Sequence, residues 1–126
     1  MVTSDIAQFS EECNTWREVL RSQREEFTRM KNELQQAVAH ITSKEALKDV
    51  EHYENQFDIQ LANIHDLKQS IKLYNRAPVL QPMSDDGVLA GGVASGYEKL
   101  SADYQNLRQR LHEIKNDFRR FLVNYT

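Results

Sequence analysis

Residues 6–41 read IAQFSEECNTWREVLRSQREEFTRMKNELQQAVAHI, and their spacing specifies the fold class. Apolar side chains recur at alternating steps of three and four residues without a slip, and Gln23 is the one polar residue in the series. This spacing is the a/d seam of a heptad repeat, so it predicts one long amphipathic helix over about residues 4–41. The apolar seam residues are Ile6, Phe9, Cys13, Trp16, Leu20, Phe27, Met30, Leu34, Ala37 and Ile41.

The same spacing returns twice further along the chain. One seam, over residues 50–74, has Gln60 as its single polar member, and another, over residues 97–125, is apolar or aromatic throughout. A serine or threonine followed three residues later by glutamate is the capping box that starts helices, and one precedes each of these seams. We therefore expect helices over about residues 43–76 and about residues 96–125. The two boxes are Thr42 with Glu45 and Ser95 with Glu98.

Residues 77–95 break the pattern. They hold both prolines and three of the four glycines of the chain, and they contain no lysine or arginine. Pro78 cannot continue a helix and ends the second one at or before Arg76. Connections of this length are uncommon in compact domains and are usually functional or disordered. We expect a mobile linker that crosses one end of the molecule; a segment that packs on the helices or binds a partner is the alternative.

Three helices with narrow apolar seams bury those seams only by packing on one another. The tight connection at residues 42–44 makes the first two helices antiparallel neighbours. The sequence thus predicts one all-α domain over residues 1–126, an elongated antiparallel three-helix bundle with long, coiled-coil-like helices. A single helix running through residues 41–44 is the competing interpretation. The continued seam would then place charged residues inside, namely Lys44, Lys48 and Glu51.

Two resemblances accompany this pattern. Three long heptad helices, with Trp16 at a d position, resemble the bundle of spectrin repeats, and this implies the architecture alone. Residues 53–61, YENQFDIQL, and residues 63–68, NIHDLK, resemble a group of uncharacterised small bacterial helical-hairpin proteins. The second resemblance covers more than the first half of the chain. It carries no known activity and so implies nothing about chemistry.

Charge and composition narrow the classes of partner. The net charge is −3, from 16 basic and 19 acidic residues, and no segment carries the clustered basic stripe typical of nucleic-acid binding. No apolar run is long enough to span a membrane. The single cysteine, Cys13, cannot form an internal disulfide. We therefore expect a cytoplasmic protein that does not bind nucleic acid.

No set of residues has the spacing of a catalytic or metal site. A di-iron bundle needs Glu-x-x-His on two helices, and the nearest match is Asp49 with His52, in a single copy. His65 and His112 fall at outward heptad positions. Cys13 falls on the seam, where a thiol acts as a small hydrophobic group. We predict that the protein is not an enzyme and binds no cofactor or metal.

The two seam glutamines admit two interpretations. In an antiparallel pair with its turn at residues 42–44, Gln23 lies within about one turn of Gln60. A buried amide pair there would fix register and partner at a cost in stability. Side chains that reach solvent from a loosely packed layer are the alternative.

These observations favour a non-catalytic protein–protein interaction or structural module, with a protein partner that the sequence does not identify. Apolar residues outside the seams favour a homodimer or larger assembly over a lone bundle. Apolar residues of the linker folding back over the same surface are the competing account. A ligand- or metal-binding bundle assembled by dimerisation is the alternative from another class. The candidate interaction face comprises Ile59 and Leu73 on the second helix and Phe118, Phe121, Leu122 and Val123 on the third.

Overall fold

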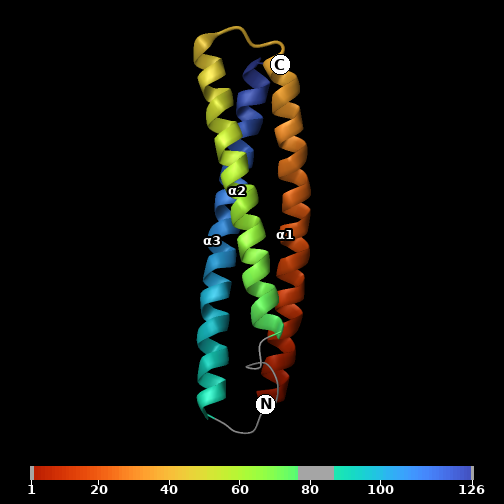
Figure 1. The fold of residues 1–126 in the computed structure, drawn as a ribbon, viewed down its shortest axis with the longest axis vertical. Helices are drawn as coiled ribbons and strands as arrows, with labels where there is room; N and C mark the ends of the chain where they lie inside the picture. The colour runs from red at the N-terminus through yellow and green to blue at the C-terminus, as the bar shows by residue number, and fades with distance from the viewer. Residues whose placement is uncertain (1, 77–86, 126) are drawn as a thin grey trace.

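The computed structural model describes residues 2–76 and 87–125, with the side chains of residues 8–74 and 96–124. Its elements are α1 (Val2–Val38), α2 (Lys44–Arg76) and α3 (Gly87–Tyr125), and no strand occurs in these ranges. The helices lie side by side along one axis, and α2 runs antiparallel to both α1 and α3 (Figure 1). The elongated all-α three-helix bundle predicted from the heptad spacing is therefore confirmed.

The break between α1 and α2 occurs where the seam pattern predicts it, but its ends differ in detail. α1 ends at Val38 rather than near residue 41, and the backbone N–H of Ile41 donates to the Val38 carbonyl at 3.1 Å. Ser43, rather than Thr42, precedes the first residue of α2. Its Oγ accepts a hydrogen bond from the backbone N–H of Ala46 at 3.4 Å, which is the arrangement of an N-cap.

α3 begins nine residues before the expected position. Residues 87–95, which we assigned to the linker, are helical, and the predicted capping box at Ser95 lies inside the helix. Each glycine destabilises a helix by about 1 kcal/mol relative to alanine, and the glycines of this segment therefore favour the prediction of a linker. The seam spacing nevertheless continues back from Tyr97 to Val93 and Ala90, and extending an existing helix needs no new nucleus. The expected mobility of residues 77–86 concerns a segment outside the described residues.

One phenylalanine from each helix forms a layer of the core. Phe27 of α1, Phe57 of α2 and Phe118 of α3 are each fully buried. The ring centroids of Phe27 and Phe57 lie 5.7 Å apart, those of Phe57 and Phe118 lie 4.9 Å apart, and both pairs meet edge to face. This geometry adds about 0.5–1.5 kcal/mol per pair beyond the area buried. Phe57 therefore joins all three helices at one height, and we call these residues the phenylalanine layer.

Aromatic stacking aligns α1 with α3. Tyr97 stacks on Phe9 with ring centroids 4.2 Å apart, and Tyr104 stacks on Trp16 at 5.1 Å. The two pairs are seven residues apart on both helices, so the parallel helices share one heptad register. The a/d seams predicted for the first and third helices therefore face one another.

The two seam glutamines have different environments. Gln60 is buried, with 2% of its surface exposed, and its Oε1 accepts a hydrogen bond from Asn63 Nδ2 at 3.1 Å. Gln23 is only partly buried. The buried-pair interpretation is therefore wrong for Gln23, and the amide of Gln60 is satisfied one turn along its own helix.

Candidate interaction surface

Three of the six residues predicted to form the interaction face are exposed. Ile59 and Leu73 on α2 expose 50% and 67% of their surfaces, and Val123 on α3 exposes 77%. Ile59 and Leu73 are two heptads apart and so lie on one line along α2. Val123 lies near the end of α3, at the opposite end of the bundle from the end of α2 (Figure 1). Of these exposed residues, only Ile59 and Leu73 therefore lie together on one surface, along α2.

The prediction is wrong for Phe118 and Phe121. Both are buried, at 0% and 6% exposure. Their rings contact Tyr53 of α2, with centroid distances of 5.5 Å and 5.1 Å, because α2 covers the aromatic end of the α3 seam. Leu122 is partly buried and packs against the core. The wide apolar surface at the end of α3 is thus mostly used within the bundle.

A hollow of about 320 Å³ lies between α2 and α3, beside the line of Ile59 and Leu73. Asn63, Asp66 and Ser70 line it from α2, and they occupy the steps of four and three residues between the two aliphatic residues. We call the hollow together with Ile59 and Leu73 the α2–α3 groove. The residues that line the hollow are Asn63, Asp66, Leu67, Ser70, Asp103, Asn106, Leu107 and Arg110.

The charges in the α2–α3 groove are only partly paired. Asp103 forms an ion pair with Lys99, with 3.0 Å between Nζ and Oδ2. Among the residues whose side chains are described, neither Asp66 nor Arg110 has an ion-pair partner within 4.0 Å. The groove therefore presents one carboxylate, that of Asp66, and one guanidinium, that of Arg110, without an ion-pair partner among the described side chains. Sequence reasoning did not place Asp103, Asn106 and Arg110 beside the line on α2, because only the packing of α3 on α2 brings them there.

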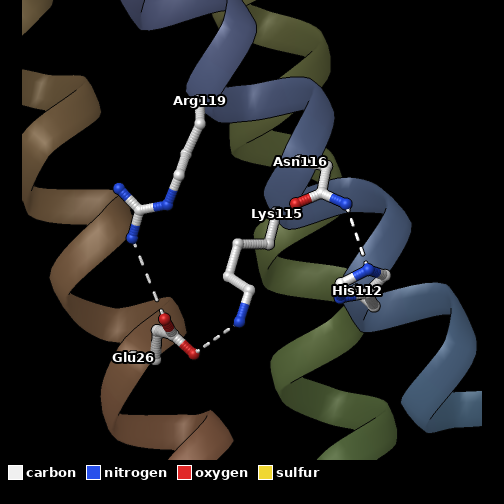
Figure 2. Close-up of polar contacts among 5 residues, drawn as sticks. All are labelled: Glu26, His112, Lys115, Asn116 and Arg119. Atoms are coloured by element: carbon white, nitrogen blue, oxygen red, sulfur yellow. Dashed lines mark hydrogen bonds and ion pairs between the residues drawn. The ribbon is translucent and has the colours of Figure 1, made fainter.

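A cluster of charges joins α1 to α3 at the opposite side of α3. The Glu26 carboxylate forms ion pairs with Lys115 at 3.3 Å and with Arg119 at 3.9 Å. Figure 2 shows both of these side chains extending from α3 towards α1. Glu26 and Lys115 each expose 24% of their side chains, so the pair is partly shielded from solvent. His112 and Asn116 hydrogen-bond along α3 at 3.1 Å. This cluster supports the parallel register of α1 and α3.

The only cysteine belongs to a group of titratable side chains. The hydroxyl of Tyr97 donates to a Glu12 carboxylate oxygen, and this bond is the main cause that raises the pKa of Tyr97 to about 12. Burial raises the pKa of Tyr74 to about 12 and that of Cys13 to about 11. An ideal Cβ on Gly96 would lie 2.5 Å from Tyr74 Cε2, so the absence of a side chain at Gly96 lets this ring approach α3. Cys13 is a protonated, buried thiol at neutral pH, as its seam position predicts.

These pKa shifts predict a loss of stability at alkaline pH. The folded-state pKa values of Cys13, Tyr74 and Tyr97 lie above the ordinary values of 9.0 for cysteine and 10.0 for tyrosine. The contribution of these protonated groups to the free energy of unfolding is complete when the pH lies below the ordinary pKa values. It is lost as the pH rises through the folded-state pKa values. We expect the free energy of unfolding, measured in urea by circular dichroism, to fall between about pH 9 and about pH 12. Tyr97→Phe should reduce the slope; equal slopes in both proteins would contradict this assignment.

The histidines stay at the surface, as their heptad positions predict. His52, His65 and His112 are exposed, and the ring of His52 meets the Tyr53 ring edge-on at 5.4 Å. Over the described side chains, no three His, Cys, Asp or Glu residues converge in a way that could hold a metal ion. In the same part of the chain, no helix is both long and apolar enough to cross a membrane.

Comparison of the chain with models of protein families, with curated proteins and with solved structures gives no match.

Proposed function

We propose that this protein is a non-catalytic interaction module that binds another helical protein, a second copy of itself included, through the α2–α3 groove. The observation that carries the proposal is the exposure of Ile59 and Leu73, at 50% and 67%, on one line of α2. Aliphatic residues on one line of a helix are the anchors by which one helix recognises another, and here the two anchors are two heptads apart with Asp66 at the heptad position between them. Most apolar seam residues with described side chains are buried within the bundle, whereas Ile59 and Leu73 lie outside the seams and stay exposed, as do Leu47 and Val123.

Apolar burial supplies the affinity in this proposal, and the hollow supplies specificity. Covering a leucine or isoleucine side chain completely contributes about 1.5–3 kcal/mol. The polar residues between the two anchors, Asp66 and Arg110 among them, add little net energy but disfavour partners without complementary groups. The partner helix would therefore place apolar side chains at the two ends of the groove and polar ones between them.

Two further expectations belong to the same proposal. A cytoplasmic location accords with a single buried thiol that takes part in no disulfide. The resemblance to spectrin repeats, which concerns architecture alone, and the resemblance to small bacterial helical-hairpin proteins stay predictions, and neither implies an activity for this chain.

Photo-cross-linking in the native cell tests the proposed function. A benzophenone amino acid replaces Ile59 or Leu73, and illumination should then produce an adduct heavier than the chain in both variants. The same amino acid at Glu51, which is exposed on another line of α2, is the matched control and should give no such adduct. Equal labelling at all three positions, or none at Ile59 and Leu73, would overturn the proposal.

A further inference from the structure

We infer that the occupant of the α2–α3 groove is a second copy of this chain, with the two α2 helices antiparallel and a two-fold axis passing beside Asp66. The inference rests on the proposed function, and it adds the partner and the geometry of binding. The juxtaposition that carries it is the symmetric placement of Ile59 and Leu73 about Asp66, combined with Arg110 in the same hollow.

The apolar anchors are self-complementary. Ile59 and Leu73 lie seven residues on either side of Asp66, on the same heptad line. A two-fold axis perpendicular to α2 reverses the direction of that helix, so residue 59 of one chain meets residue 73 of the other, and the reverse contact follows by symmetry. One operation therefore covers Ile59 and Leu73 of each chain, four side chains in total, and leaves neither anchor facing solvent.

The charges of the hollow suit the same arrangement. Two Asp66 carboxylates would approach each other at the axis, and alone they would repel. Arg110 lines the same hollow from α3, and it has no ion-pair partner among the described side chains. When the second α2 lies over the groove, its Asp66 comes beside Arg110 of the first chain. The two carboxylates and two guanidiniums then alternate around the axis, so that each charge has a partner of opposite sign.

Disulfide cross-linking of the full chain tests this geometry. Asp66→Cys should form a covalent dimer under mild oxidation, because only residues near a two-fold axis meet their own copies within the short reach of a disulfide. Ile59→Cys mixed with Leu73→Cys should give the mixed dimer, whereas each of the two alone should give little. Native Cys13 can remain in place, because it is fully buried.

Two controls separate the proposed dyad from random collision. His65 is exposed and lies next to Asp66 in the sequence, but it points in another direction from α2. His65→Cys should therefore not cross-link. Arg110→Asp should weaken the dimer, because it removes the charge that pairs with Asp66 of the other copy, and the exchange of both residues, Asp66→Arg with Arg110→Asp, should restore it. Equal cross-linking at positions 65 and 66, or a failed exchange, would overturn the dyad. A photo-adduct at Ile59 with a mass other than that of two copies of the chain would overturn the inference that the occupant is a second copy. The proposed function would still stand, because the adduct would identify another protein in the groove.

Discussion

Phe57→Ala is expected to lower the free energy of unfolding by about 3–5 kcal/mol, the usual cost of removing a buried aromatic ring. Phe57 is fully buried, and its ring contacts Phe27 of α1 and Phe118 of α3 at the same time. Truncation removes both edge-to-face contacts and leaves a cavity that three straight helices cannot easily close. Small domains are stable by only about 5–15 kcal/mol, so this one change removes a large part of the total.

Urea denaturation followed by circular dichroism measures this loss. Glu51→Ala, at an exposed site on the same helix, is the control and should change the free energy of unfolding by no more than about 0.5 kcal/mol. A loss below about 1 kcal/mol for Phe57→Ala would show that the phenylalanine layer does not hold the three helices together.

The seams of the bundle follow from sequence, because helix packing uses the same spacing along the whole chain. Phe27, Phe57 and Phe118 all fall on predicted seam positions, and all three are buried. The outward placement of His65 and Ile59 follows from the same heptad count. A strict repeat has only one way to bury a narrow stripe, so fold class and core residues are decided locally.

The ends of the helices depend on competition between weak local terms. Thr42 and Ser43 are both good capping residues, and a shift of one residue between them changes the energy by little. The position at which α3 starts depends on two opposing free-energy terms. Its glycines destabilise the helix, whereas extending a helix that has already formed needs no new nucleus. Neither balance is visible in the spacing of apolar residues, so the cap at Ser43 and the start at Gly87 differ from expectation.

The α2–α3 groove could be only half predicted. The exposed positions of Ile59 and Leu73 are properties of one helix, and the heptad count identifies them. The contribution of Arg110 depends on which side of α3 packs against α2, and that is a property of three helices together. The same limit explains Phe121, because sequence alone did not show that Tyr53 of α2 covers this ring.

The mass of the protein in solution, measured by light scattering at high micromolar concentration, tests the assembly most directly. We expect the wild-type chain to show twice its mass of 14.7 kDa. Ile59→Glu with Leu73→Glu should halve the measured mass, because the exchange places four carboxylates where the two copies bury apolar side chains. Circular dichroism should show unchanged helicity, since both residues are exposed in the single bundle. A wild-type chain that is monomeric at that concentration, or a variant of undiminished mass, would contradict self-association through α2.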